Sequence, residues 1–187
     1  IDISSNELSN VSINLSNYRN LKTLDFSKNQ ISQFNIYGNN QKFIELQLNN
    51  CGLNTIPSSI FKISSLKILG LSENNITHIP PEILQLQNLQ KIDLSKNQIK
   101  NFDSDIFGLQ KLEIVDLSHN KLSSFIISGS IPTNITELIL GKNNISIFSS
   151  NNLSKLKFLD ISFQNSKLIV NLEKCPNLEI LDISGNI

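Results

Sequence analysis

Several residue types are absent or scarce in this chain of 187 residues, and each absence narrows its possible functions. Methionine, tryptophan and alanine do not occur. Because methionine is absent, we expect the natural start of the protein to lie outside this sequence. Arginine, the residue best suited to bidentate phosphate recognition, occurs once, at Arg19. The 16 basic and 16 acidic residues balance, so no net charge favours a nucleic acid or a membrane surface.

Long hydrophobic runs are also missing, and no stretch approaches the roughly 20 apolar residues of a membrane-spanning helix. The start of the chain lacks the basic and then apolar pattern of a signal peptide. Only two cysteines occur, Cys51 and Cys175, and their distance in the sequence predicts two free buried thiols. No cysteine and histidine spacing fits a metal site, and no glycine-rich phosphate loop occurs. We therefore expect no metal, no cofactor and no membrane insertion.

One pattern, L-x-x-L-x-L-x-x-N-x-L, fills the chain and is clearest at residues 66–76, 89–99 and 112–122. Its asparagine position falls at residues 6, 29, 51, 74, 97, 120, 143, 164 and 186. A period this regular indicates one supersecondary unit per repeat, each stacked on its neighbours in a solenoid.

With this pattern the chain resembles the leucine-rich repeat family over essentially its whole length. The resemblance implies an α/β leucine-rich repeat solenoid, or horseshoe, of about nine repeats. It has a parallel concave β-sheet and short 3₁₀ or irregular convex segments. We expect residues 1–187 to form one domain that is uncapped at both ends and is part of a longer solenoid.

Within each repeat the pattern assigns scaffold roles. The alternating x-L-x-L-x segment predicts a strand with one buried face, and stacked asparagine amides are expected to satisfy backbone groups at the turn. Cys51 and Gln164 are expected to interrupt this ladder. A second core stripe is expected at Phe34, Ile56, Ile79, Phe102, Phe125, Phe148 and Ile169. Prolines 57, 80, 81 and 132 favour extended or short 3₁₀ return segments.

Catalytic residues are not evident. Asp116, Ser118 and His119 lie within four residues, but neighbours on one strand alternate faces and cannot form a nucleophile, base and orienting group. The acidic positions of the strands follow the commonest form of the repeat, so we interpret them as scaffold. The sequence therefore predicts that this chain is not an enzyme.

Departures from the repeat mark the candidate partner-binding residues on the concave face. A mixed-charge patch is expected near Asp93 and Asp116, formed by Lys91, Lys96, His119 and Lys142. An exposed apolar cluster is expected toward the C-terminus, formed by Ile114, Ile139, Phe158, Phe163 and Ile180. Missing repeats or another segment could instead cover this cluster.

We predict a non-catalytic recognition module, in signalling or scaffolding, that binds a protein partner and no nucleic acid. Two alternatives are an extracellular receptor or adhesion ectodomain and a regulatory segment of a larger enzyme. Residues 107–122 and 131–146 resemble Toll-like receptor ectodomain repeats, whereas residues 79–92 resemble intracellular scaffolds. Six glycosylation sequons are about what random order would give, and the absence of cysteine-rich caps leans toward a reducing compartment such as the cytoplasm.

Overall fold

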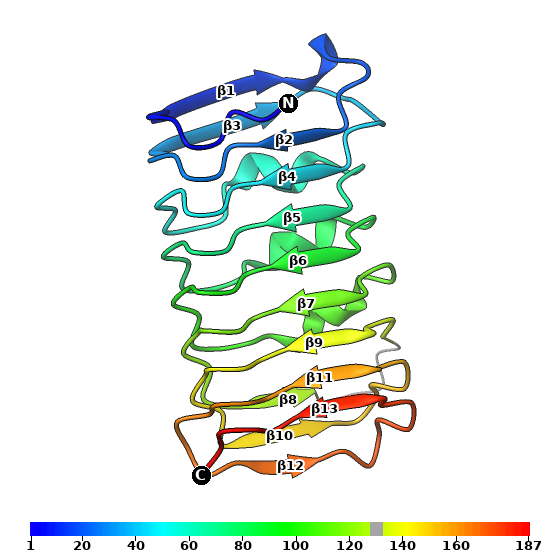
Figure 1. The fold of residues 1–187 in the computed structure, drawn as a ribbon. Helices are drawn as coiled ribbons and strands as arrows, with labels where there is room; N and C mark the ends of the chain where they lie inside the picture. The colour runs from blue at the N-terminus through cyan, green and yellow to red at the C-terminus, as the bar shows by residue number, and fades with distance from the viewer. Residues whose placement is uncertain (128–132) are drawn as a thin grey trace.

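The computed structural model describes residues 1–127 and 133–187 and shows a stack of repeats with the termini at opposite ends (Figure 1). One parallel sheet runs the length of the stack, with its strands in sequence order. Its eight strands are β2 (Thr23–Asp25), β4 (Glu45–Gln47), β5 (Ile68–Gly70), β6 (Lys91–Asp93), β7 (Ile114–Asp116), β9 (Glu137–Ile139), β11 (Phe158–Asp160) and β13 (Ile180–Asp182). A bridge between Asp2 and Asp25 adds the first repeat. The predicted solenoid of about nine repeats is confirmed.

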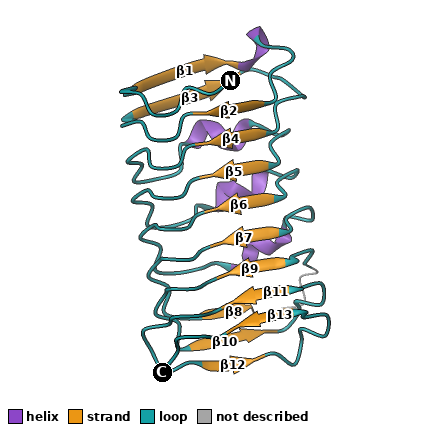
Figure 2. Ribbon diagram, viewed as in Figure 1, coloured by secondary structure: helices purple, strands orange, loops and turns teal. Residues whose placement is uncertain are grey.

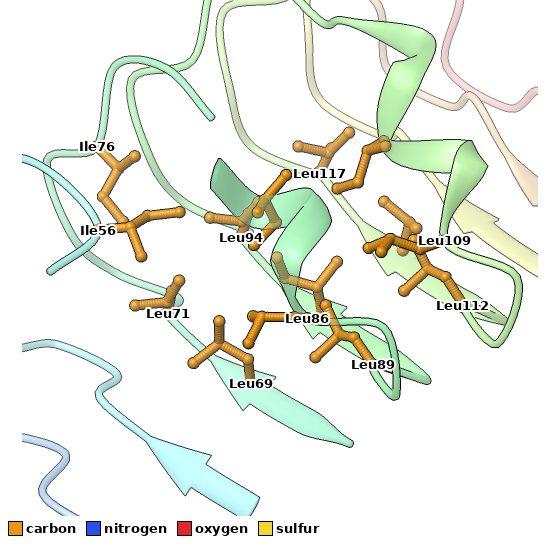
Figure 3. Close-up of a cluster of buried hydrophobic side chains, with 14 of the residues drawn as sticks. Ile56, Leu69, Leu71, Ile76, Leu86, Leu89, Leu94, Leu109, Leu112 and Leu117 are labelled. Carbon is orange, nitrogen blue, oxygen red and sulfur yellow. The ribbon is translucent and has the colours of Figure 1, made fainter. Parts of the chain in front are cut away.

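The core lies directly behind this sheet. Leu69 of β5 and Leu71 after it point inward and are fully buried, as are Leu94 and Leu117 in the next repeats. Leucines of the return segments, among them Leu86, meet them from the other side (Figure 3). Each such side chain stabilises the fold by about 1.5–3 kcal/mol through burial, which is why short strands suffice once they are stacked.

A ladder of asparagine side chains joins consecutive repeats at the turn after each strand. Asn120 Nδ2 donates to the backbone oxygens of Leu94, at 2.9 Å, and Leu117, at 3.1 Å. Its Oδ1 accepts from the backbone N–H of Ile99 at 2.9 Å. Asn29, Asn74, Asn97 and Asn143 repeat this arrangement. The buried turn is thereby satisfied at each step.

The expected interruption of the ladder at Gln164 is wrong, whereas at Cys51 the thiol keeps only the donor part of the asparagine arrangement. Gln164 Nε2 donates to the backbone oxygen of Leu140 at 3.0 Å, and its Oε1 accepts from the backbone N–H of Ile145 at 2.9 Å. Its extra methylene group reaches the same partners that an asparagine would. The thiol of Cys51 donates to the backbone oxygen of Phe26 at 3.3 Å. Both cysteines are free and buried, as predicted.

The return segments differ between the middle and the ends of the stack (Figure 2). The middle repeats carry the predicted 3₁₀ turns, η2 (Ser58–Lys62), η3 (Pro81–Gln85) and η4 (Ser104–Gly108), while η1 (Leu15–Asn17) lies near the N-terminus. Pro57 and Pro80 directly precede η2 and η3, and Pro132 lies outside the described residues. No helix in the described residues is long and apolar enough to cross a membrane.

Two short parallel sheets form the remaining return segments, which the repeat pattern did not predict. They are β1 (Asn10–Asn14) with β3 (Gln33–Tyr37), and β8 (Phe125–Ile127) with β10 (Ile147–Ser150) and β12 (Ile169–Asn171). Alternating β-branched and aromatic residues favour strands there. Phe125 pairs with Phe148, and Phe148 pairs with Val170. Ile169 is therefore not in the core stripe as expected. It is 62% exposed, because the loop after Gln164 is one residue longer.

Candidate protein-binding face

Strand register arranges the solvent-facing side chains of the eight-stranded sheet in rows. We call this surface, the predicted concave side, the sheet face. The first row runs along the sheet through Thr23, Glu45, Ile68, Lys91, Ile114, Glu137, Phe158 and Ile180. The second row runs through Asp25, Gln47, Gly70, Asp93, Asp116, Ile139, Asp160 and Asp182. Neighbours in a row are one strand spacing apart, about 4.8 Å.

The aspartates of the second row have a scaffold role. Asp93 Oδ1 accepts from the backbone N–H of Ser95, and Asp116 Oδ1 accepts from the backbone N–H of Ser118, both at 2.9 Å. Asp25, Asp160 and Asp182 make the same bond two residues on. Burial raises the pKa of Asp116, and the nearby carboxylates of Asp93 and Asp160 raise it further. No group in the described ranges could hold a metal ion with three or more histidine, cysteine or acidic side chains.

The predicted mixed-charge patch does not form as one cluster. Lys96, His119 and Lys142 occupy the turn position before the asparagine ladder, where the backbone has a positive φ of 52–56°. Lys91 instead lies in the first row, at the other end of β6. Lys96 pairs with Glu73 at 2.6 Å rather than with Asp93. Three basic side chains therefore line the turn edge. Burial lowers the pKa of His119, and the positive charges of Lys142 and Lys96 lower it further.

The same turn keeps His119 from acting with its sequence neighbours. Its φ of 53° takes the chain out of the strand, while the carboxylate of Asp116 is engaged by the backbone of Ser118. The hydrogen bonds of the described residues thus join aspartate to the backbone and give no serine, histidine and acid relay.

The predicted apolar cluster is partly assembled. Ile139, Phe158 and Ile180 line a shallow cleft of about 540 Å³ on the sheet face, together with Thr136, Glu137, Lys157 and Glu179. Ile114 lies one strand outside it, separated from Phe158 by Glu137 in the first row. Ile180 is 57% exposed. We call this surface the C-terminal cleft.

Phe163 lies apart from the C-terminal cleft. It occupies the turn position, with a φ of 50°, and its ring packs where a Cβ of Gly185 would lie. The ammonium of Lys142 lies 5.9 Å from the ring centroid. Phe163 is 51% exposed and so extends the basic turn edge with an aromatic surface. In other repeats the turn position is occupied by Asn50 and Gly185, residue types that tolerate a positive φ. These two residues could have indicated the turn from the sequence.

Comparison with known families agrees with this geometry. A protein-family model described as leucine rich repeat matches residues 44–99, 64–122 and 87–145 of the chain. A second leucine-rich repeat family model matches residues 19–32. The first model alone spans residues 44 to 145, which is more than half of the chain. The chain belongs to the leucine-rich repeat family. No curated protein matches it.

Solved leucine-rich repeat structures share the fold. Internalin C2 from Listeria monocytogenes is 23% identical with a TM-score of 0.68, over 95% of this chain and 79% of that one. The leucine-rich repeat domain of APL1B is 24% identical with a TM-score of 0.78, over 99% of this chain and 53% of that domain. TLR13, solved in complex with ssRNA13, is 25% identical with a TM-score of 0.79, over 97% of this chain and 28% of TLR13. The chain thus spans about half of the APL1B domain and less than a third of TLR13.

The leucine-rich repeat consensus breaks most clearly in β9. Ile139 takes the usual aspartate position, and Gly141 takes the usual serine position two residues on. A Cβ at residue 141 would lie 2.7 Å from Asp160 Oδ2, so the carboxylate of Asp160 leans across the glycine. The sequence-based prediction missed Glu137, Lys157 and Glu179 as neighbours of the C-terminal cleft. Cross-strand register, which places Glu137 beside Phe158, could have indicated the first of them.

Proposed function

We propose that this chain is a non-catalytic protein-binding module, in signalling or scaffolding, that engages its partner at the C-terminal cleft. The leucine-rich repeat fold is commonly a protein-interaction module, and the family and its structural neighbours are typically non-enzymatic. The finer assignment rests on one observation: Ile139, Phe158 and Ile180 form an apolar floor on a face whose remaining positions in the two rows are mainly polar.

An exposed apolar patch with a charged rim is the usual make-up of a binding hot spot, and a central aromatic residue commonly contributes most of the affinity. Phe158 is that residue here, because it lies between Glu137 and Ile180 in the first row. The other predicted contact residues have secondary roles in this proposal. Ile114 and Lys91 continue the first row, while Lys96, His119, Lys142 and Phe163 offer a second contact along the turn edge.

A photo-crosslinking amino acid at position 180 tests the proposal, with position 126 as its matched control. Ile126 in β8 is also an exposed isoleucine but lies on the back of the stack. We expect a partner protein to be crosslinked from position 180, and we expect that protein not to be crosslinked from position 126. This partner is then purified and titrated against the wild type, Phe158→Ser and Ile126→Ser.

Loss of the aromatic anchor is expected to weaken affinity by about 30-fold, a typical hot-spot effect, while Ile126→Ser leaves it unchanged. Circular dichroism would verify that both variants stay folded. A partner that crosslinks from position 126 and binds Phe158→Ser as tightly as the wild type would rule out the sheet face as its site.

A receptor ectodomain is the second candidate, because the sequon asparagines Asn75 and Asn144 are both exposed. Intact-mass analysis of the protein from its natural source tests this. N-glycan mass at both positions supports an extracellular role, and an unmodified chain contradicts it.

A further inference from the structure

We infer that the C-terminal cleft selects a partner segment in which a lysine or arginine stands next to an apolar side chain. This inference rests on the proposed function and adds the chemistry of the partner to it. The apolar side chain would contact Ile139, Phe158 and Ile180, and the cation would meet the carboxylate of Glu137.

The apolar part of the cleft is a gap in an acidic row. Register places Ile139 between Asp116 of β7 and Asp160 of β11. In the next row toward the strand starts, Phe158 lies between Glu137 and Ile180. An apolar side chain that enters the cleft thus lies near carboxylates on both sides of Ile139 in the second row and on the Glu137 side of Phe158 in the first row.

The single cation of the cleft lining is already neutralised. Lys157 Nζ lies 2.9 Å from Glu179 Oε1, which leaves Glu137 as the lining carboxylate without an ion pair among the described residues. Glu137 is exposed at the start of β9. A partner cation can approach it without breaking an existing ion pair, whereas a partner carboxylate would have to compete with Glu179 for Lys157, the cation of the lining.

Asp160 adds a second source of negative charge near the apolar floor. Its carboxylate leans over Gly141 on β9, the strand that carries Ile139. The neighbouring carboxylates of the second row repel one another, and this repulsion contributes to the raised pKa of Asp116. A cation bound at the cleft would relieve part of that repulsion, so it gains from more than one carboxylate.

Apart from Lys157, the basic residues of the sheet face lie outside the C-terminal cleft, and Lys91 of the first row is two strands from Glu137. Lys96, His119 and Lys142 lie in the turns after their strands, whereas Glu137 and Phe158 begin theirs. From β9 to β13 the strand starts are therefore acidic and apolar, with Glu137, Phe158 and Ile180 in the first row, whereas the turn edge carries the cation of Lys142. An acidic partner segment would be directed to that edge and away from the C-terminal cleft.

Selection of random peptides displayed on phage, against the whole chain, tests the inference. Selections are run in parallel on the wild type, on Glu137→Lys and on Glu82→Lys, an equal charge change on the exposed surface of η3. Peptides are assigned to the cleft when Phe158→Ser abolishes their binding. We expect cleft peptides from the wild type and from Glu82→Lys to pair lysine or arginine with an apolar residue, and those from Glu137→Lys to lose the basic residue.

The strongest selected peptide is then synthesised and titrated. Glu137→Lys is expected to weaken its affinity by about tenfold, and Glu82→Lys to leave it unchanged. Raising the ionic strength should weaken wild-type binding, because a partly exposed charge pair is screened. Cleft peptides without basic residues, or with acidic ones, would overturn the inference while the proposed function stands. If no peptide is sensitive to Phe158→Ser, both the proposed function and the inference fail.

Discussion

The regular repeats of β6 and β7 and the irregular repeats of β9 and β11 have the same scaffold but different surfaces. Around β6 and β7, Asp93 and Asp116 bind backbone N–H groups and Asn120 carries the ladder. In β9 the aspartate is replaced by Ile139, yet the ladder continues through Asn143 after β9 and through Gln164 after β11. The two regions show that the solenoid conserves its buried hydrogen bonds while the sheet face changes freely. Surface departures from the repeat can therefore serve binding with little effect on the fold.

Removal of the ladder amide in each region provides the strongest test of this equivalence. Gln164→Ala would remove the hydrogen bond of the backbone N–H of Ile145 and one of the two hydrogen bonds to the backbone oxygen of Leu140, which keeps the bond from Asn143 Nδ2. Because Gln164 is 2% exposed, water cannot replace them, and we expect a loss of about 2–4 kcal/mol. Asn120→Ala should cost a similar amount, as measured by urea unfolding followed by circular dichroism.

Gln164→Asn is the control for side-chain length. The shorter amide should recover only part of the loss, because the extra methylene is what reaches the neighbouring repeat. If Gln164→Ala costs no more than a surface substitution such as Asn144→Ala, the ladder does not continue through the irregular repeat.

The sequence alone predicted the sheet, its inward leucines and most of the asparagine ladder, because these follow from the repeat period. It could not predict what depends on register between repeats of unequal length. Val170 rather than Ile169 packs against the core for this reason, and Gln164 reaches the ladder partners through its longer side chain. The sequence analysis also assigned Lys142 to the mixed-charge patch and Phe163 to the apolar cluster. Both residues lie at a backbone turn that it did not recognise.

The candidate site was predictable in part for the same physical reason. Alternation on the strands identified Ile139, Phe158 and Ile180 as outward-facing residues. The charged rim depends on which side chains the register brings beside them, and so Lys157 and Glu179 emerged only from the structure.

Converting β9 to a polar strand of the regular kind should abolish the difference between the two regions. In the double variant Ile139→Asn, Gly141→Ser, the new amide can accept from the backbone N–H of residue 141, as Asp116 does from Ser118. We expect the free energy of unfolding to change by less than about 1 kcal/mol. Affinity for the selected basic and apolar peptide should fall by about tenfold, as measured by isothermal titration calorimetry.

Gly141→Ser alone separates charge placement from the apolar floor. A Cβ there must displace the carboxylate of Asp160, so we expect peptide affinity to fall by only about threefold. A double variant that binds as well as the wild type would show that the irregular surface of β9 is not part of the site.

The smallest expected effect distinguishes Asp116 of the regular region from Asp182, in β13 beyond the irregular region, by the sign of the contribution of each carboxylate to stability. Burial, with repulsion from Asp93 and Asp160, raises the pKa of Asp116 above its ordinary value of 3.8. The folded chain thus holds this proton more tightly than the unfolded chain, and stability falls as pH rises through that window. Asp116→Asn keeps an acceptor for Ser118 and removes the charge, so it should stabilise the fold at pH 7 by about 0.2–1 kcal/mol.

Asp182 in β13 is expected to respond in the opposite direction. Hydrogen bonds from Ser184 lower the pKa of its carboxyl group, so the ionised form contributes stability above pH 3.8 that is lost as pH falls through the lowered pKa. Asp182→Asn should therefore destabilise at neutral pH, whereas the gain from Asp116→Asn should disappear as the pH approaches 3.8. Thermal unfolding of both variants between pH 3 and pH 7 measures these changes in stability. This interval covers the range of about pH 3 to 5 in which carboxyl groups titrate and the range above it. Destabilisation by Asp116→Asn at pH 7 would mean that its hydrogen bond to Ser118 outweighs the repulsion within the acidic row.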